Sequence, residues 1–188
     1  MKDRFFYRLM KFIFYIPMTK ILYNIEIVGI ENIPREGRVI LAGNHTKWLD
    51  PVMLVLLTKR QLHFLAKEEL FHGVIKPFII GMGCIPVNRK IHDKDALISA
   101  YKTLEIDNAI AIFPEGTINR TEDTIMPFKI GAVKMAKEAN ATIVPFTITG
   151  DYKIFRGATI EFLKPMKVKG NLDDANKELM NVIRKNCF

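Results

Sequence analysis

Short apolar runs alternate with amphipathic runs along most of this chain, and this alternation constrains the fold more than any other feature. The strand candidates are residues 38–44 (RVILAGN), 61–66 (QLHFLA), 84–87 (CIPV), 109–113 (AIAIF) and 141–149 (ATIVPFTIT). The helix candidates between them are residues 51–58, 68–80, 93–105 and 128–139, and a late edge strand (158–168) and a closing helix (173–185) follow. Continuous apolar strands are typical of sheets buried on both faces, so the pattern predicts an α/β fold with a mainly parallel sheet covered by helices.

The length and composition predict one globular core. The chain has 188 residues, of which 49% are hydrophobic and 13 are Phe, which is enough for one sizeable core and too little for two independent ones. We therefore predict an N-terminal helix over residues 1–24 and a single domain over residues 25–188. The formal net charge of +8 favours an anionic partner, namely nucleic acid, an acidic lipid surface or a phosphorylated substrate.

The first 23 residues combine basic and aromatic side chains. Five of them are Lys or Arg and one is Asp, and the apolar residues recur at helical spacing with the basic residues on the other side. Internal charges and Pro17 divide the stretch into runs too short for a membrane span, so we expect a helix in the headgroup layer of an anionic membrane. A terminal helix packed on the core or on a second subunit is the alternative. The predicted membrane contacts are Arg4, Phe5, Arg8, Leu9, Lys11 and Phe12.

The few cysteines and the single serine argue against a cysteine metal site or disulfide framework and against a serine nucleophile. The spacing of Cys84 and Cys187 suggests neither a metal site nor a disulfide framework and favours a reducing, cytosolic environment. The one serine, Ser99, lies in a predicted mid-helix segment without the glycine-flanked turn of a serine nucleophile. The histidines outside the first motif have no metal-ligand spacing, and no metal site is predicted.

The stretch NHTKWLDP, directly after the first strand candidate, is the strongest candidate for chemistry. Asp50 suits a helix N-cap and Pro51 a first helical position, which is a complete structural explanation on its own. However, a strand end followed by a short loop would also let Asp50 reach His45. An Asp that accepts a hydrogen bond from one ring nitrogen makes the other nitrogen a better base, so His45 is a candidate general base for a hydroxyl.

Three further motifs follow strand candidates. IFPEGT, which contains Glu115, would expose backbone N–H groups and a carboxylate where open α/β sheets bind ligands, although it could be an ordinary turn. GMGCIPVNRK ends in Arg89, which could bind a phosphate with two hydrogen bonds or be a solvated surface residue. Pro145 interrupts IVPF and is more typical of a bulge or an edge strand than of a site.

In order and spacing, NHTKWLD, GCIPVNR, FPEGT and IVPF resemble the four blocks of the glycerolipid acyltransferase family, which includes the 1-acylglycerol-3-phosphate acyltransferases. HFLAKEELF and MPFKIGAVKMA resemble segments between those blocks, and the resemblance covers about residues 25–150. It implies the single-domain glycerol-phosphate-acyltransferase-like fold, without a metal or cofactor. It also implies that His45 is the base and Asp50 its orienting residue, and that the substrate-binding residues are Lys67, Arg89, Glu115, Gly116, Thr117, Arg120 and Pro145.

The chain departs from the family pattern at three positions. Pro86 replaces a usual aromatic residue, and Ile118 and Asn119 replace the usual Arg and Ser after the third block. Arg120 could supply the missing cation, or the head group of the acceptor could differ from the family's commonest one.

The resemblance implies transfer of a fatty acyl group from acyl-CoA or acyl carrier protein to the hydroxyl of 1-acylglycerol 3-phosphate, forming phosphatidate. It also implies a peripheral enzyme on the cytoplasmic face of the cell membrane, with a lysophospholipid acceptor and no nucleic-acid partner. The alternatives are acylation of another lysolipid or alcohol, a thioester hydrolase, and a non-catalytic basic module that binds lipid or nucleic acid.

Overall fold

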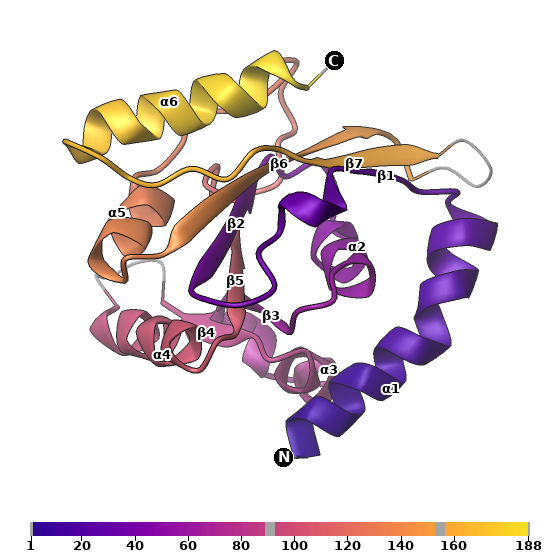
Figure 1. The fold of residues 1–188 in the computed structure, drawn as a ribbon. Helices are drawn as coiled ribbons and strands as arrows, with labels where there is room; N and C mark the ends of the chain where they lie inside the picture. The colour runs from indigo at the N-terminus through magenta and orange to yellow at the C-terminus, as the bar shows by residue number, and fades with distance from the viewer. Residues whose placement is uncertain (1, 89–92, 153–156, 188) are drawn as a thin grey trace.

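The computed structural model describes residues 2–88, 93–152 and 157–187, with the side chains of residues 2–6 and 10 left out. Its centre is a seven-stranded sheet with the strand order β1-β7-β6-β2-β5-β3-β4 (Figure 1). All neighbouring strands pair in parallel except β6 and β7, so the predicted mainly parallel α/β fold is confirmed. The strands are β1 (Glu26–Val28), β2 (Val39–Gly43), β3 (Leu62–Lys67), β4 (Ile85–Val87), β5 (Ala109–Ile112), β6 (Thr142–Gly150) and β7 (Ala158–Phe162).

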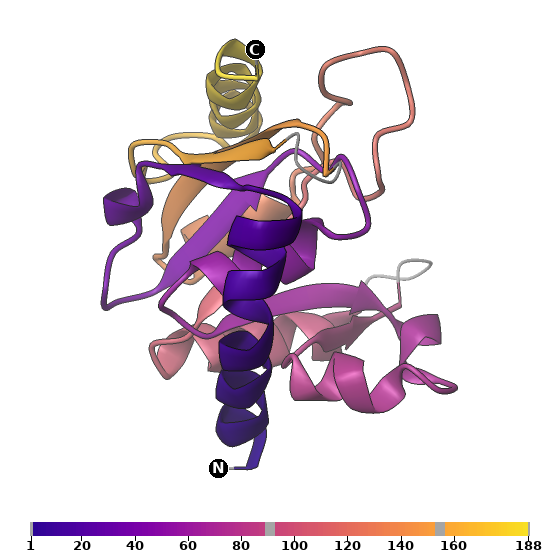
Figure 2. The ribbon, with the colours of Figure 1, turned by 90° about the vertical axis from the view of Figure 1, so that its right-hand side faces the viewer.

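Helices cover both faces of this sheet. One face carries α1 (Lys2–Ile16), α2 (Asp50–Leu57) and α3 (Lys76–Gly81), and the other carries α4 (Lys94–Glu105), α5 (Gly131–Glu138) and α6 (Leu172–Lys185) (Figures 1 and 2). Strand β2 explains this arrangement, since successive side chains point to opposite faces. Leu41 packs into the cluster under α2 and Ile40 into the cluster under α4 and α5, and both side chains are fully buried.

The structure corrects the predicted helix over residues 68–80. A short 3-10 turn, η3 (Glu68–Phe71), is separated from α3 by a segment in which Gly73 has a φ of +80°. A left-handed residue ends helical hydrogen bonding, and glycine adopts it at low cost. The apolar residues of this run fit a helix, but Gly73 within it interrupts the helical hydrogen bonding.

The late strand is also different from its prediction. It ends at Phe162 and is not an edge strand, because β1 pairs with it along Glu26–Val28. Strand β1 was missed because it has only three residues, two of which are exposed, so it shows no apolar run. A second 3-10 turn, η2 (Ile30–Asn32), leads from β1 towards β2.

The N-terminal helix packs on the domain through one side. The buried hydroxyl of Tyr7 donates to the carbonyl of Arg60 (3.3 Å) and accepts from the N–H of Leu62 (3.0 Å), which fixes α1 beside the start of β3. Pro17 does not end the helical path, since a π-helical turn, η1 (Pro17–Leu22), continues it. Over the part of the chain that the structure describes, no helix combines the length and apolarity needed to cross a membrane.

Candidate active site

The sheet brings the first and third motifs together at one edge. Strands β2 and β5 are parallel neighbours with Ala42 opposite Ile112, so the residues that follow them leave the sheet side by side. Two hydrogen bonds join these exits: the N–H of His45 donates to the Glu115 carboxylate (2.7 Å), and the N–H of Asn119 donates to the carbonyl of His45 (2.8 Å). The carboxyl edge of a parallel sheet is where open α/β folds bind ligands.

His45 and Asp50 are in direct contact. Nδ1 of His45 lies 2.8 Å from Oδ2 of Asp50, and the Asp50 side chain is fully buried while 15% of the His45 side chain is exposed. The same oxygen accepts from the backbone N–H of Thr46 (2.7 Å) and Lys47 (2.9 Å). An Asp that engages Nδ1 leaves Nε2 as the nitrogen that can take a proton.

The structure corrects the helix-cap reading of Asp50. Helix α2 begins at Asp50, its N-cap is Leu49 and no side chain caps it. The Asp50 carboxylate instead faces back to the loop that carries His45. Pro51 still lies within the first turn, where its missing N–H costs no helical hydrogen bond.

Phe113 and Asn44 help to hold His45 in place. The Phe113 ring stacks on the His45 ring with centroids 4.0 Å apart and planes 18° apart. The buried amide of Asn44 donates to the carbonyl of Ile148 (2.8 Å) and accepts from its N–H (2.7 Å), which anchors the end of β2 to β6. The base candidate is therefore fixed from the strand, the loop and the ring face.

Glu115 supports the two turns. It is 3% exposed, and its second oxygen accepts from the N–H of Met126 (2.9 Å) while the first holds His45. Burial raises the pKa of Glu115, against the lowering effect of these hydrogen bonds. Both carboxylate oxygens are thus used within the protein. Next to it, Gly116 has a φ of +76°, and Nζ of Lys129 would lie 2.8 Å from a Cβ added there.

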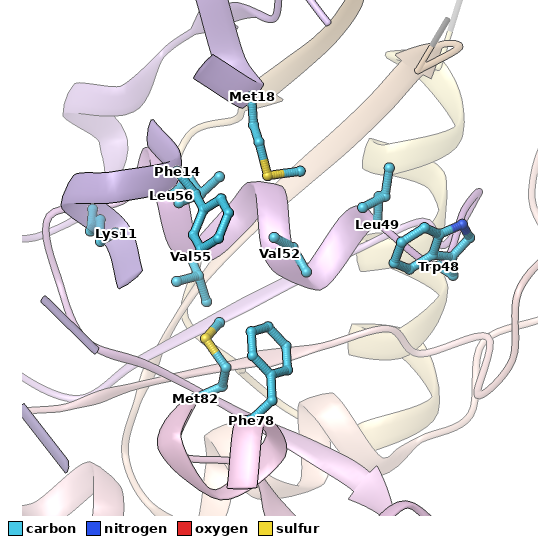
Figure 3. Close-up of a pocket in the computed structure, with 10 residues that line it drawn as sticks. All are labelled: Lys11, Phe14, Met18, Trp48, Leu49, Val52, Val55, Leu56, Phe78 and Met82. Carbon is cyan, nitrogen blue, oxygen red and sulfur yellow. The ribbon is translucent and has the colours of Figure 1, made fainter. Parts of the chain in front are cut away.

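An apolar groove of about 200 Å³ opens beside this site (Figure 3). Helices α1, α2 and α3 form its walls, with Trp48 at one end and Lys11 at the other. Trp48 is 73% exposed and lies three residues after His45. Burial lowers the pKa of Lys11 to about 8. The remaining lining residues are Phe14, Met18, Leu49, Val52, Val55, Leu56, Phe78 and Met82.

The structure places the other predicted substrate-binding residues in different surroundings. Lys67 ends β3 and is exposed at the same edge of the sheet, while Thr117 and Arg120 are exposed on the loop after β5. Pro145 is buried in an interior strand opposite Ala42, so the edge-strand reading is wrong. It does not line the apolar groove, and its role in substrate binding stays a prediction. Arg89 lies outside the described residues.

The predicted membrane contacts divide in the same way. Arg8, Leu9 and Phe12 are exposed, and Phe12 is 84% exposed. Lys11 is not on the solvent side with Arg8 but half-buried in the groove. The side chains of Arg4 and Phe5 lie outside the description.

The side chains considered for other chemistries are a buried thiol, a serine within a helix and a histidine with two polar neighbours. Burial raises the pKa of the Cys84 thiol to about 12, which disfavours the thiolate. Ser99 lies within α4. Nδ1 of His63 lies 2.7 Å from the carbonyl of Gly83 and Nε2 lies 3.1 Å from the amide nitrogen of Asn108. Within the described ranges, no three His, Cys, Asp or Glu side chains gather as metal ligands.

Sequence reasoning missed several residues of this site. Phe113 belongs to the motif IFPEGT, but its stacking on His45 was not predicted. The contacts of Asn44 and Lys129 join separate segments of the chain. Trp48 could have been found, since an exposed aromatic residue beside a candidate base is a common sign of an apolar ligand. The groove itself could not, because three separate helices build it.

The fold and the site define an α/β domain that presents a His–Asp pair beside an apolar groove. The family model described as Acyltransferase matches residues 24–149. The chain therefore belongs to the acyltransferase family.

Relatives and a solved structure agree with this assignment. The chain is similar to the 1-acyl-sn-glycerol-3-phosphate acyltransferases of Borreliella burgdorferi (36% identity over 70% of this chain and 53% of that protein) and Bacillus subtilis (31% over 67% and 63%). The matched part of the chain thus spans between about half and two thirds of the length of these relatives. The crystal structure of the 1-acyl-sn-glycerophosphate (LPA) acyltransferase, PlsC, from Thermotoga maritima has the same fold, with a TM-score of 0.79 at 19% identity over 97% of this chain and 78% of that one.

Proposed function

We propose that this protein transfers a fatty acyl group from a thioester, acyl-CoA or acyl carrier protein, to the free hydroxyl of 1-acylglycerol 3-phosphate, forming phosphatidate. The observation that carries the proposal is the contact between His45 Nδ1 and Asp50 Oδ2 at 2.8 Å, beside an apolar groove. The family membership and the names of the relatives support the same reaction.

The proposed chemistry needs one base. Nε2 of His45 removes the proton of the acceptor hydroxyl as the oxygen attacks the thioester carbonyl. The tetrahedral intermediate collapses by breaking the C–S bond, and the imidazolium returns the proton to the leaving thiolate. Buried Asp50 stabilises the imidazolium that forms in between. A thioester is already activated, so the proposed reaction requires neither a cofactor nor a covalent enzyme intermediate.

The groove is the proposed site for an acyl chain. Nine of its ten lining residues are apolar, so a chain in it would leave water without burying polar groups. The phosphate would lie on the other side of His45, at the edge of the sheet that carries Lys67 and Lys129. Two cations of this kind would favour an anionic head group.

We also propose that the protein binds the surface of an anionic membrane, as a peripheral protein of the cytoplasmic face. The apolar side chains of α1 that face away from the domain are Leu9, Phe12, Ile13 and Ile16, and Arg8 and Lys20 are exposed near them. Val74, between η3 and α3, is 98% exposed. Apolar side chains next to basic ones suit the boundary between acyl chains and anionic head groups.

The test is thiol release from acyl-CoA or, separately, acyl carrier protein, with and without 1-acylglycerol 3-phosphate. We expect release that requires the lysolipid and falls about a hundredfold or more in His45→Ala. The matched control is His72→Ala, which removes an exposed histidine of η3's C-terminal side and leaves the rate unchanged. Release without the lysolipid indicates a hydrolase, and an unchanged rate in His45→Ala refutes the role of the base.

A further inference from the structure

The two oxygens of the Asp50 carboxylate have unequal hydrogen bonding. Oδ2 accepts from His45, Thr46 and Lys47 at 2.7 to 2.9 Å. Oδ1 has one longer contact, with the Thr46 hydroxyl at 3.3 Å. A fully buried carboxylate oxygen normally has better partners than this, because an unpaired one costs free energy. Oδ1 therefore has room for a further donor.

Tyr152 has a buried hydroxyl that could donate a hydrogen bond to such an oxygen. It follows β6, packs against the core under α2 and makes an edge-to-face contact with Tyr23, with ring centroids 5.9 Å apart. Its hydroxyl is buried and, among the described residues, has no partner in strict hydrogen-bond geometry. Tyr152 lies beside the loop that leads to Asp50, since the carboxylate of its neighbour Asp151 pairs with Nζ of Lys47 at 3.6 Å. Burial first, and then the charge and hydrogen bonding of Asp50, raise the pKa of Tyr152.

We propose that Tyr152 is a positioning residue that donates its hydroxyl to the free side of the Asp50 carboxylate and thereby sets the basicity of His45. The expected effect of Tyr152 on acyl transfer rests on the proposed function, whereas its expected effect on the pKa of His45 does not. A buried donor without a partner and a buried acceptor with a spare site satisfy one another when they meet. Tyr152 would then be the third member of a chain from hydroxyl to carboxylate to imidazole.

The direction of the effect follows from charge. A hydroxyl that donates to Asp50 spreads the negative charge of the carboxylate, so the carboxylate stabilises protonated His45 less. Removing the hydroxyl should raise the pKa of His45. The other charged groups around the pair are Glu115, which contacts the His45 backbone, and the exposed Lys47–Asp151 ion pair at 3.6 Å. Neither changes in a Tyr-to-Phe variant.

The first test measures the pKa of His45 directly, by NMR of protein with labelled histidine. His45→Ala assigns the signal among the four histidines. We expect Tyr152→Phe to raise this pKa by about 0.3 to 1 unit. The control Tyr23→Phe removes a hydroxyl from the ring that contacts Tyr152 and should leave it within about 0.1 unit. Thermal unfolding checks that both variants are folded.

The second test uses the acyl-transfer assay. The acidic limb of the pH dependence of kcat/KM should move up by the same amount in Tyr152→Phe, with kcat lower by about threefold to tenfold. If Tyr152→Phe does not fold, global replacement by 3-fluorotyrosine in the unmutated protein should lower the His45 pKa, because a more acidic hydroxyl donates more strongly.

The outcomes separate this inference from the proposed function. An unchanged His45 pKa in Tyr152→Phe, or the same change in Tyr23→Phe, overturns the role of Tyr152. If the unmutated protein transfers no acyl group, the proposed function fails, yet the NMR shift still decides whether Tyr152 acts on Asp50 and His45.

Discussion

Replacing Asp50 by Asn is the most direct test of how the site would work. Asn keeps the size of the side chain, and its carbonyl oxygen can still accept from the N–H groups of Thr46 and Lys47, which now bond to Oδ2 at 2.7 and 2.9 Å. The loop should therefore keep its path. What is lost is a buried negative charge next to an imidazole that becomes positive during the reaction.

The structure allows the size of this loss to be worked out. With Nδ1 and Oδ2 2.8 Å apart, the centres of the two charges are about 4 Å apart, and at an effective dielectric constant of about 20 their attraction is about 4 kcal/mol. Because 1.36 kcal/mol is a factor of ten in rate, kcat should fall about a thousandfold. The KM for the thioester should change little, since the groove is untouched.

The assay is lysolipid-dependent thiol release over a range of pH, with circular dichroism to check the fold. Thr46→Val is the matched control, because it removes only the 3.3 Å contact to Oδ1 and should cost less than about tenfold. A loss below tenfold in Asp50→Asn, with the fold intact, would refute the idea that the charge of Asp50 stabilises the imidazolium.

Three further predictions concern other parts of the molecule. Burial raises the pKa of the Cys84 thiol to about 12, so native Cys84 should react with iodoacetamide about a thousandfold more slowly than an ordinary thiol. Mass spectrometry measures this rate, and Cys84→Ala should keep full activity. Lys11→Leu should raise the thermal unfolding midpoint by a few degrees below pH 8, because the native protein there buries a charged lysine at a cost in folding free energy. This gain should disappear as the pH rises towards about 10.4, where Lys11 is neutral in the unfolded chain as well. Phe12→Asp should weaken binding to anionic vesicles about tenfold or more, whereas Ile98→Asp, on exposed α4, should not; equal binding by both variants would contradict contact through α1.

The central part of the fold was predictable because each element carries its own local signal. Strands β2, β3, β5 and β6 are apolar runs that end within one or two residues of the predicted positions. By contrast, β1 has no such signal and exists because β7 supplies its hydrogen-bond partners. The failures thus occur where tertiary pairing determines an element that local sequence does not.

The same distinction applies to the site. The contact of His45 with Asp50 was predictable, because only five positions separate them and a short loop joins His45 to the helix that Asp50 begins. The hydrogen bonds from His45 to Glu115 and from Asn44 to Ile148 join residues 70 and 104 positions apart, so they could not be derived from spacing. Lys11 was misplaced because helical periodicity gives its side of the helix but not which side faces the domain.

Helix α2 links the base candidate to the groove. Its first residue, Asp50, orients His45, while Val52, Val55 and Leu56 line the groove on one side of the helix, at the three- and four-residue spacing of a helix face. An eight-residue helix is about 12 Å long and rigid, so the distance from Nε2 of His45 to a chain in the groove would be set by a single element. A thioester carbonyl would then be brought to the base by the burial of its acyl chain, which is how binding energy from an unreactive part of a substrate can position the reacting atoms.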